Sequence, residues 1–180
     1  VVLVTPGQIS EFQSVIDAAS LGLDLHLVEG GAERQISIQN GLAALPGDTD
    51  IVVIHDAARP FVSEQAVRAS IEAAEQYGAA TVALPSVDTV LRGDADAFLE
   101  DTPPREAMWL CQTPQVFRTK VIRDAHDRAK ADRTQVTDDA TLVKRYGNPV
   151  KLVPGDRLNF KITTPADIAF AEAVIEQGLA

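Results

Sequence analysis

A carboxylate and a guanidinium stand close together directly after an apolar run near the middle of the chain. The run is Ile51-Val52-Val53-Ile54, and Asp56 and Arg59 follow it within five residues. A carboxylate can hold a hydrated Mg²⁺ on a polyphosphate, and a guanidinium can form paired hydrogen bonds with a phosphate or carboxylate. A plainer interpretation is that Asp56 caps a helix starting near Ser63, with Arg59 as its ion-pair partner. The pattern leaves both interpretations open.

Two adjacent glycines, Gly30 and Gly31, form a second candidate site. They fall between an expected strand and an expected helix, where a backbone without side chains can approach a ligand closely. Free amides at the start of a helix also favour an anion or the edge of a base. The alternative is an ordinary tight turn, with Arg34 solvated beside it.

The elements that must position these residues alternate between strands and helices. We expect strands at 1–5, 23–28, 50–56, 79–85, 150–153 and 158–162, and helices at 12–19, 38–45, 64–77, 119–130, 137–147 and from 164 onward. The β-branched run at 50–56 is typical of a strand buried on both faces of a parallel sheet. Open α/β sheets bind ligands at the carboxyl ends of such strands, where Asp56 and Arg59 fall. Thr137 or Asp138 is expected to cap the helix that follows it, a structural role.

Residues 86–117 interrupt this alternation. Residues 89–92 look extended, 93–96 and 101–104 look like turns, and the chain returns from 105. A two-stranded ribbon cannot bury its own faces, so we expect it to pack against a second copy of the chain, with Met108 and Trp109 in the interface. A lid that folds back on its own domain is the alternative.

Length, charge and composition exclude several classes of protein. A chain of 180 residues is most economically one domain, and a net charge of −10 disfavours nonspecific nucleic-acid binding. No apolar run approaches the ~20 residues that a membrane-spanning helix needs. A single cysteine, Cys111, excludes an internal disulfide and suits a reducing, cytoplasmic location. An anionic ligand must therefore meet a local group of cations, of which the candidates are Arg34, Arg59, Arg105, Arg157 and Lys161.

Several short motifs occur in a specific order along the chain. They are Gly30-Gly31-x-x-Arg34-x-x-Ser37, His55-Asp56-Ala57-Ala58-Arg59-Pro60, Asp88-Thr89, Arg105-x-x-x-Trp109, Thr113-Pro114-Gln115-x-Phe117, Thr137-Asp138-Asp139-Ala140 and Asn159-Phe160-Lys161-Ile162-Thr163-x-Pro165-x-Asp167. Together they resemble the 2-C-methyl-D-erythritol 4-phosphate cytidylyltransferase family, over essentially the whole chain. Members of that family join CTP and methylerythritol phosphate in nonmevalonate isoprenoid synthesis and release pyrophosphate.

The resemblance implies an α/β fold of the Rossmann-like nucleotidyltransferase kind. In that fold a mostly parallel sheet lies in three α/β/α layers, and a β-arm protrudes to exchange contacts across a homodimer. The resemblance also implies Mg²⁺ as the cofactor, with CTP and a sugar-alcohol phosphate as the partners.

Carried over by position, the family motifs assign roles to individual residues. The cytidine pocket is implied to contain Gly30, Gly31, Ala32 and Ser37. The metal is implied to bind Asp56, with Ala57 and Arg59 beside the nucleotide and the sugar phosphate, and with Thr89 and Thr113 holding methylerythritol phosphate. The attacking phosphate is implied to be positioned by Lys161 and by Arg105, which reaches over from the arm of the partner.

One family feature is missing from the chain. Family members begin with a strand and a Gly-rich loop, with an Arg and a later Lys, that wraps the CTP triphosphate, and nothing in residues 1–50 supplies it. Val1 opens an apparently buried strand without a Met, so we expect that the natural N-terminus is missing. The chain is then expected to keep the sugar-phosphate half of the site with little or no turnover. Ile36 also stands where a polar residue is expected beside Ser37.

Three other functions stay open. The nearest is a cytidylyltransferase for another polyol phosphate such as ribitol 5-phosphate, because such relatives share the Asp-Ala-Ala-Arg-Pro and Lys-Ile-Thr pieces. The second is a non-catalytic binding module descended from the enzyme, whose native gene would also lack the Gly-rich loop. The third is a purely structural dimerisation protein, which would not bind methylerythritol phosphate.

Overall fold

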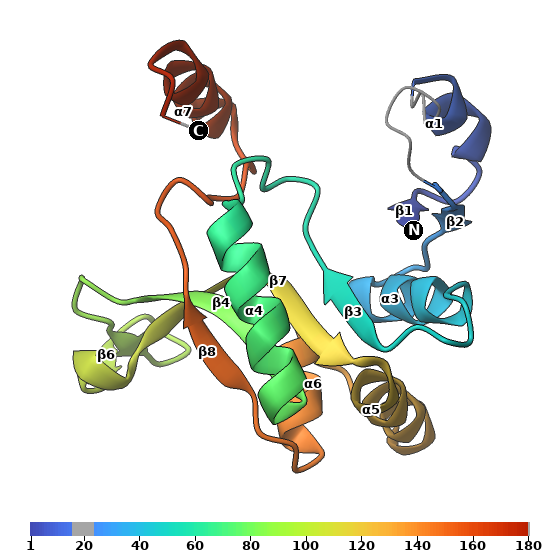
Figure 1. Cartoon of the computed structure of the whole chain (residues 1–180). Helices are drawn as coiled ribbons and strands as arrows, with labels where there is room; N and C mark the ends of the chain where they lie inside the picture. Colours follow the sequence, from blue (N-terminus) through green and yellow to red (C-terminus); the bar gives the residue numbers. More distant parts are fainter. Residues whose placement is uncertain (16–23, 180) are drawn as a thin grey trace. The chain divides into compact units, whose positions relative to one another are not determined.

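A computed structural model describes residues 1–15 and 24–179 of the chain, and Figure 1 labels its helices and strands. The chain divides into two compact units. The first unit contains residues 1–50 and 119–148, and the second contains residues 51–118 and 149–180. Whether residues 1–180 fold as one domain stays a prediction. Over the described ranges, no helix is both long and apolar enough to cross a lipid bilayer.

The first unit combines a short parallel strand pair with helices. Strand β1 (Val2–Val4) pairs in parallel with β2 (Leu27–Glu29). The helices of this unit are α1 (Ile9–Val15), α3 (Arg34–Ala43), α5 (Thr119–Asp132) and α6 (Asp139–Arg145). The expected helix at 12–19 and strand at 23–28 are described only in part, because residues 16–23 lie outside the described ranges. Helix α6 is capped by Asp138, whose carboxylate accepts from the Thr141 amide, so the capping role is confirmed.

The described part of the second unit is built on a four-stranded sheet in the order β3-β7-β4-β8. The strands are β3 (Ile51–Ile54), β7 (Trp109–Arg118), β4 (Ala79–Pro85) and β8 (Lys151–Pro154). Strands β4 and β8 are parallel, and β7 runs antiparallel to both β3 and β4. Three strands therefore share one direction, which agrees with the predicted mostly parallel sheet, and β7 is an antiparallel insertion between two of them.

Helix α4 (Glu64–Tyr77) lies across one face of this sheet (Figure 1). It begins where predicted because the Ser63 hydroxyl accepts from the Ala66 amide, and it ends at Gly78, which has a φ of 90°. A residue with a side chain adopts that left-handed conformation only at a cost, so Gly78 is a natural stop. The core beneath the helix contains Ala74, Ala80, Val116 and Val153.

Two strand predictions need correction. Strand β3 is not buried on both faces, because Val53 is 42% exposed between the buried Val52 and Ile54. The predicted strand at 158–162 is wrong, since residues 155–164 form no strand. There the Asp156 carboxylate accepts from the Leu158 amide, which turns the chain away from strand pairing. The apolar alternation that suggested a strand is therefore carried by an irregular loop.

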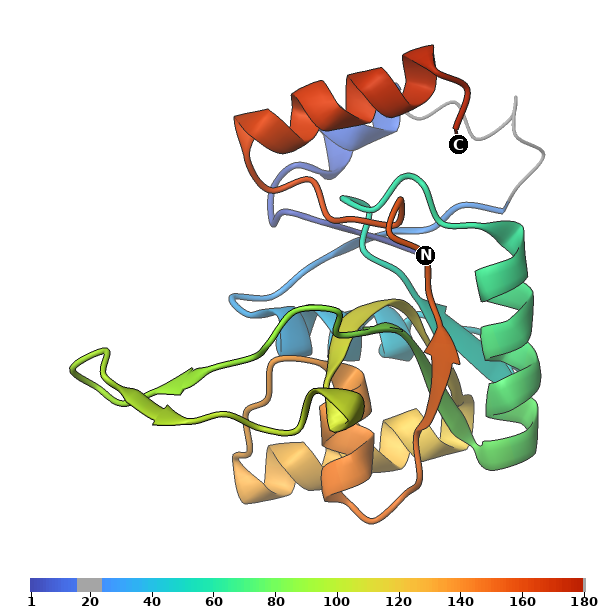
Figure 2. The same ribbon diagram turned by 90° about the vertical axis from the view of Figure 1, so that its left-hand side faces the viewer.

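The predicted arm is present as an exposed ribbon. Strands β5 (Arg92–Gly93) and β6 (Leu99–Asp101) pair antiparallel, and a short 3₁₀ turn at Arg105–Ala107 leads into β7. Figure 2 shows this ribbon extending away from the sheet of its own unit, and every residue from 91 to 102 is exposed. Its contact with a second copy of the chain stays a prediction.

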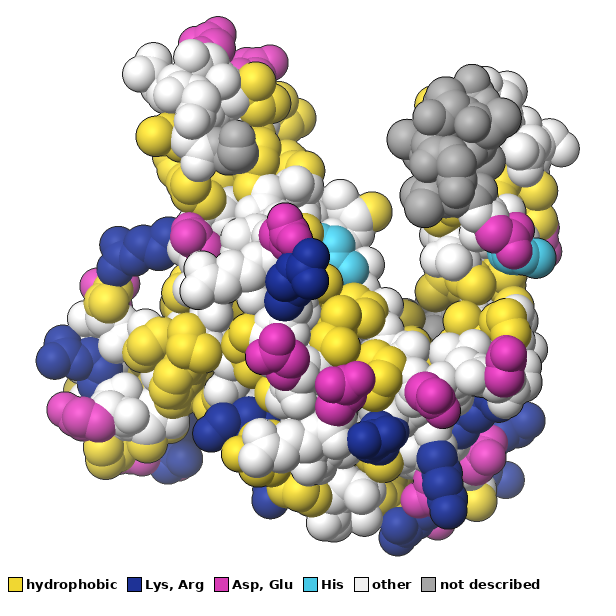
Figure 3. Space-filling view, in the orientation of Figure 1, with side chains coloured by type: hydrophobic (Ala, Val, Ile, Leu, Met, Phe, Trp, Pro, Cys, Tyr) yellow, Lys and Arg dark blue, Asp and Glu magenta, His cyan; other side chains and the backbone are white. Residues whose placement is uncertain are grey.

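Helix α7 (Pro165–Glu176) has the predicted start. The Thr164 hydroxyl accepts from the Asp167 amide, and the Asp167 carboxylate accepts from the Thr164 amide. This capping box satisfies amides that the first helical turn leaves without partners. Figure 3 shows apolar side chains gathered along α7, and several there are at least half exposed, namely Ile168, Phe170, Ile175 and Leu179.

Candidate active site

Three charged side chains meet where β3 ends. The Asp56 Oδ2 atom lies 3.0 Å from Lys161 Nζ and 3.6 Å from Arg59 Nε. The side chains of Asp56 and Arg59 are 19% and 13% exposed, whereas that of Lys161 is 45% exposed. One carboxylate therefore contacts a cation close to it in the sequence, Arg59, and a distant one, Lys161. Of the two, the lysine side chain is more open to solvent. We call these three residues the Asp56 cluster.

The alternative in which Asp56 caps the following helix is wrong. Ser63 caps α4, and the Asp56 carboxylate faces Lys161 as well as Arg59. The main chain turns here instead, with the Arg59 amide donating to the Asp56 carbonyl at 2.9 Å. This turn places the acid and the guanidinium on the same side of the strand end.

A hydrogen-bonded chain through His55 and Thr113 fixes the backbone of Asp56. The Asp56 amide donates to Thr113 Oγ1 at 3.0 Å, and that hydroxyl lies 2.9 Å from His55 Nδ1. His55 Nε2 lies 2.9 Å from the carbonyl of Arg59. A carbonyl can only accept, so these partners assign the proton to Nε2 and leave Nδ1 to accept from the Thr113 hydroxyl. Thr113 is 5% exposed, and both roles of its hydroxyl are already used inside the protein.

The Arg59 guanidinium is held by main-chain carbonyls as well as by Asp56. Its Nη1 donates to the Asn159 carbonyl at 2.8 Å, and its Nη2 lies 3.5 Å from the Cys111 carbonyl. Its Nε makes no hydrogen bond to the described residues, although the Asp56 carboxylate is close. A guanidinium has about five N–H donors, so donors remain for a ligand. Arg59 can thus bind a phosphate without giving up its internal contacts.

The other residues predicted for the acceptor lie on or beside the arm. Ala57 is exposed at the strand end, and Thr89 is exposed at the base of the arm. Arg105 is exposed, and its Nη1 donates to the Val87 carbonyl at 3.1 Å. Within one chain, the guanidinium is therefore held along the base of its own arm. The prediction that Arg105 serves the site of a partner is not tested here.

The glycine pair in the first unit is packed tightly against the start of α3. The Gly31 amide donates to Ser37 Oγ at 2.9 Å, and the Ser37 hydroxyl donates to the Glu33 carbonyl at 3.0 Å. A Cβ atom on Gly31 would overlap the side chain of Ile36, and one on Gly30 would lie 2.9 Å from Ser37 Oγ. Both positions therefore need glycine for the local fold. Ala32, beside them, is exposed, and the predicted nucleotide contacts of these four residues are not tested by the geometry.

Arg34 is not a solvated side chain, so that interpretation is wrong. Its Nη1 lies 2.6 Å from Asp139 Oδ2, and the other Asp139 oxygen lies 2.8 Å from Nε2 of His126. The side chains of His126 and Asp139 are each 2% exposed. We call Arg34, His126 and Asp139 the Asp139 cluster. Sequence reasoning missed it, because its residues come from separate helices and no local spacing joins them.

The start of α3 is also fixed to the segment before α6 by amide side chains. Gln35 Nε2 donates to the Thr134 carbonyl at 3.0 Å, and the Val136 amide donates to Gln35 Oε1 at 3.2 Å. Gln135 Nε2 donates to both carboxylate oxygens of Glu33. The segment that carries the glycine pair is therefore anchored on one side by Ser37 and on the other by residues 134–139.

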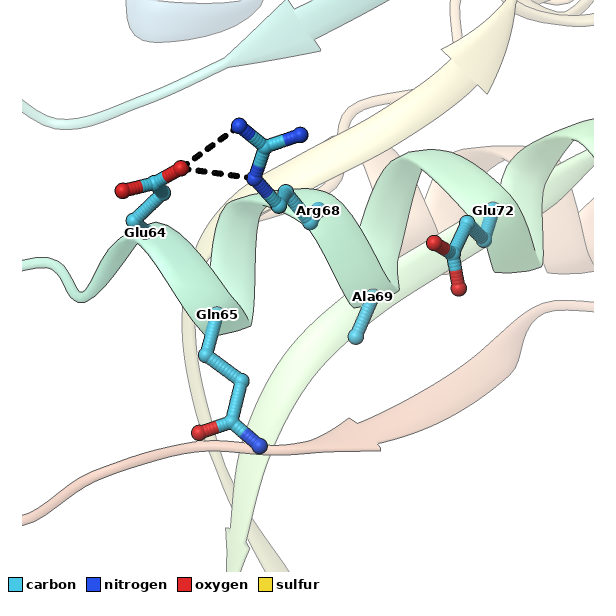
Figure 4. A pocket seen from close by; sticks show the side chains of 5 residues that line it. All are labelled: Glu64, Gln65, Arg68, Ala69 and Glu72. Atoms are coloured by element: carbon cyan, nitrogen blue, oxygen red, sulfur yellow. Dashed lines mark hydrogen bonds and ion pairs between the residues drawn. The ribbon is translucent and has the colours of Figure 1, made fainter.

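A separate hollow lies on the outer face of α4 (Figure 4). It is lined by Glu64, Gln65, Arg68, Ala69 and Glu72. The figure shows Arg68 turned toward Glu64, an exposed ion pair with a closest distance of 2.6 Å. None of the predicted site residues lines this hollow. A surface ion pair one helical turn apart is an ordinary feature of a solvated helix, so the hollow is not a candidate active site.

Comparison with known proteins decides the family. The model of the IspD family, described as 2-C-methyl-D-erythritol 4-phosphate cytidylyltransferase, matches residues 1–177. The chain belongs to this family.

Relatives with the family name resemble the chain over nearly its whole length. The 2-C-methyl-D-erythritol 4-phosphate cytidylyltransferase of Pelotomaculum thermopropionicum is 47% identical over 177 residues, which are 98% of this chain and 74% of that protein. The cytidylyltransferase of Geobacillus kaustophilus is 43% identical over 180 residues, covering all of this chain and 78% of the relative.

Solved structures of the family share the fold. The 4-diphosphocytidyl-2C-methyl-D-erythritol synthase of Anaerococcus prevotii matches 97% of this chain and 77% of its own, with a TM-score of 0.86 and 32% identity. The cytidylyltransferase of Thermus thermophilus matches 85% of this chain and 77% of its own, with a TM-score of 0.75 and 42% identity. The predicted fold class is confirmed. As a member of the cytidylyltransferase family, the chain is also a nucleotidyltransferase, as predicted.

Proposed function

We propose that the chain is a cytidylyltransferase that joins CTP and 2-C-methyl-D-erythritol 4-phosphate to give CDP-methylerythritol and pyrophosphate. Family membership supports this reaction. The observation that carries the proposal is the meeting of Asp56, Arg59 and Lys161 at the end of β3. A carboxylate with two cations is a suitable surrounding for a phosphorylated acceptor. The reaction needs two anionic groups to approach, so positioning and charge compensation supply most of the catalysis.

Lys161 is the residue we assign to the acceptor phosphate. Its side chain is 45% exposed, and its present partner is the Asp56 carboxylate at 3.0 Å. An ammonium at such a surface pair loses little by exchanging partners, because exposed ion pairs contribute only ~0–1 kcal/mol. Lys161 can therefore leave Asp56 for a phosphate, with Arg59 supplying further N–H donors from its anchored position.

Asp56 is the residue we assign to Mg²⁺. Among the described residues no group of three or more His, Cys, Asp or Glu side chains could hold a metal ion. A lone carboxylate nevertheless fits Mg²⁺, which keeps several waters and commonly binds one or two carboxylates together with substrate phosphates. When bound, the ion would offset the negative charge of the phosphates. The chain's own contribution is to hold the Asp56 carboxylate through the bonds of its backbone to Thr113 and Arg59.

The other predicted residues are assigned to one of the two substrates. We assign Gly30, Gly31, Ala32 and Ser37 to the cytidine, since the two glycines offer main chain without side chains. We assign Ala57 and Thr89 to the acceptor. Ala57 is the exposed neighbour of Asp56 in the sequence, and Thr89 is exposed at the base of the arm. Thr113 supports the acceptor site indirectly, through the amide of Asp56.

We also propose that the chain forms a homodimer through the arm, with Arg105 acting at the site of the partner. The support is an exposed ribbon with apolar side chains that it cannot bury by itself. Those side chains are Val87, Leu91, Phe98, Leu99, Trp109 and Leu110. A cytoplasmic location is proposed on the ground that Cys111 is a free, exposed thiol.

The proposed acceptor site is tested by calorimetry of methylerythritol phosphate binding to the full 180-residue chain. We expect binding by the native chain and at least a tenfold loss of affinity in Lys161→Ala. Lys151→Ala is the matched control, since Lys151 is an exposed lysine of the same unit whose ammonium lies 5.7 Å from the Tyr77 ring. The affinity of the Lys151→Ala variant should stay within twofold of that of the native chain.

Two results would contradict the proposal: no binding by the native chain, or equal loss in both variants. Ribitol 5-phosphate in the same titration tests the acceptor, because a tighter fit for it would favour the other polyol phosphate. CTP-dependent release of pyrophosphate by the same chain tests the expectation of low turnover without the Gly-rich loop.

A further inference from the structure

The loop that carries Lys161 is held without strand pairing. After β8 ends, the Gly155 amide still donates to the Ala83 carbonyl at 2.9 Å, and residues 156–164 continue without a strand. The main chain of the loop next bonds to the main chain of another segment at Ile162, whose amide donates to the Ala58 carbonyl at 2.8 Å. Something other than a sheet ladder must therefore set the position of the residues between these two points.

Two buried amide side chains do so. Asn159 is 1% exposed, and its Nδ2 donates to Gln112 Oε1 at 3.2 Å and to the Thr113 carbonyl at 2.8 Å. Gln112 is 5% exposed, and its Nε2 donates to the Asp156 carbonyl at 2.8 Å. We call Gln112 and Asn159 the amide clasp. It joins β7 to the loop at two places three residues apart.

Gly155 shows how closely the clasp is packed. A Cβ atom at this position would overlap Gln112 Oε1, and it would lie 2.8 Å from a methyl carbon of Val82. The Gln112 amide therefore occupies the space that a side chain at 155 would need. Gly155 therefore allows the loop main chain to pack directly against the Gln112 amide, which restricts movement of the loop there.

The clasp connects directly to both cations of the Asp56 cluster. The main-chain carbonyl of Asn159 accepts the Arg59 Nη1 bond at 2.8 Å, and Lys161 follows two residues later. Between them, the Phe160 ring packs 5.7 Å from the Phe61 ring and 4.8 Å from the Phe170 ring, measured between centroids. A displacement of residue 159 would thus move the acceptor of the Arg59 bond and the attachment of Lys161 together.

Stability alone does not account for an asparagine at this place. Its Oδ1 is buried and has no hydrogen-bond partner in the part of the chain that the structure describes. A buried polar atom without a partner costs ~1–3 kcal/mol. The Nδ2 donor of the side chain holds residue 159 against β7, and this places the main-chain carbonyl that accepts from Arg59.

We propose that the amide clasp is a positioning device, which sets Arg59 and Lys161 at the spacing that an acceptor phosphate requires. Neither Gln112 nor Asn159 touches the phosphate. Asn159 acts through the hydrogen bond of its carbonyl to Arg59 and through the chain to Lys161, and Gln112 acts through Asn159. This inference rests on the proposed function of the Asp56 cluster as the acceptor site.

A double-mutant cycle tests the inference in the full chain, with calorimetry of methylerythritol phosphate binding as the measurement. We expect Asn159→Ala and Arg59→Lys each to weaken binding about tenfold. The double variant should bind more weakly than Arg59→Lys alone but clearly less weakly than the product of the two losses, because Asn159 acts partly through Arg59 and partly through Lys161. Effects that multiply to about a hundredfold would overturn the inference, since independent structural damage adds in free energy.

Two further variants separate positioning from folding. Gln112→Ala removes the hydrogen bonds that the β7 residue of the clasp makes to Asp156 and Asn159, while the Asn159 carbonyl remains. This variant should also weaken binding severalfold. It replaces Asn159→Ala as the decisive variant if that protein does not fold. Val116→Ala, at a fully buried residue of the same strand, should lower the melting temperature and leave the affinity unchanged.

The two proposals fail in different ways. If the native chain does not bind methylerythritol phosphate, the proposed function is wrong and the inference falls with it. If the native chain binds and the folded clasp variants bind within twofold of it, the proposed acceptor site is supported and the positioning role of the clasp is wrong.

Discussion

Each unit of the molecule contains an aspartate with two cationic or proton-donating neighbours, but the two arrangements differ in burial. The Asp139 carboxylate is 2% exposed and pairs with the equally buried His126 and with Arg34, whose side chain is 36% exposed. The Asp56 carboxylate is 19% exposed and pairs with Arg59, which is 13% exposed, and with Lys161, which is 45% exposed. The acid is therefore fully buried in one unit and partly accessible to solvent in the other.

This difference separates a structural role from a chemical one. A buried ion pair costs several kcal/mol when one partner is removed, because the remaining charge is left without compensation. An exposed pair contributes little to stability, so its members can exchange partners with a ligand. If burial divides the two clusters in this way, loss of the aspartate should mainly lower stability in one and mainly lower activity in the other.

The largest expected effect is on stability, from Asp139→Ala. The substitution leaves the Arg34 guanidinium and the buried Nε2–H of His126 without their acceptor. We expect the free energy of unfolding to fall by ~3–5 kcal/mol. Urea unfolding of the full chain, followed by circular dichroism, measures it. Asp127→Ala, at an exposed acid on α5, is the control and should change stability by less than ~0.5 kcal/mol. A loss below ~1 kcal/mol in Asp139→Ala would remove the contrast between the clusters.

The matching variant in the other cluster, Asp56→Asn, should behave in the opposite way. We expect a loss of stability of no more than ~1 kcal/mol. The low rate of pyrophosphate release expected of the native chain with Mg²⁺ should fall by a further factor of roughly a hundred, which is about 2.7 kcal/mol of barrier. Methylerythritol phosphate binding without Mg²⁺ should persist, because Lys161 is released from its carboxylate. The comparison breaks if Asp56→Asn unfolds as readily as Asp139→Ala.

Thr113→Val should have an intermediate effect on stability. It removes a buried hydroxyl that accepts from the Asp56 amide and donates to His55, and it leaves both groups unsatisfied. We expect a loss of ~1–3 kcal/mol, measured as a shift of the urea midpoint. Thr113→Ser keeps the hydroxyl and is the control. A loss in Thr113→Ser as large as that in Thr113→Val would contradict this role of the hydroxyl, since the serine keeps the hydroxyl and lacks only the methyl group.

Arg105→Ala should reduce turnover without reducing stability, because the side chain is exposed and held along its arm by the Val87 carbonyl. Single-turnover pyrophosphate release should fall by more than twofold, or ~0.4 kcal/mol of barrier. The melting temperature should match that of the native chain. Arg92→Ala, an exposed arginine of the same arm, serves as the control. Turnover within twofold in Arg105→Ala would contradict the role assigned to Arg105.

The smallest expected effect concerns an exposed carboxylate with unusually many hydrogen bonds. Bonds from the Thr163 and Thr164 main-chain amides, followed by those of their hydroxyls, lower the pKa of Asp167 from 3.8 to about 2. A lowered folded-state pKa stabilises the fold above the ordinary value, and that contribution is lost as pH falls toward the folded pKa. Asp167→Asn should therefore melt below the native chain at pH 6, with the gap closing near pH 2. Glu172→Gln, at an exposed residue of the same helix, should show no such gap at either pH.

The sequence was informative where a local signal marks a boundary. The bounds of helix α4, 64–77, follow from apolar residues at helical spacing and from Gly78 as the stop, whereas its cap, Ser63, is visible only in the structure. Asp56 and Arg59 were expected at one sheet edge, and the family resemblance implied that Lys161 joins them, on what was taken to be a strand. That segment is nevertheless a loop, so the correct contact was reached through a wrong element.

The sequence was uninformative where distant residues decide the structure. Arg34 and Asp139 are 105 positions apart, and no periodicity links an arginine after a turn to the first residue of a short helix. The loop at 155–164 was misassigned because Leu158, Phe160 and Ile162 alternate like a strand. That loop is held by hydrogen bonds of the buried Asn159 amide, and a hydropathy pattern cannot reveal such bonds.

The ring of Phe160 lies between those of Phe61 and Phe170, and the ammonium-bearing residue is next in the chain. Because Phe170 belongs to α7, three tilted rings join this helix to the residue that precedes the lysine. The placement of Lys161 thus depends on aromatic packing from a helix that carries none of the charged groups.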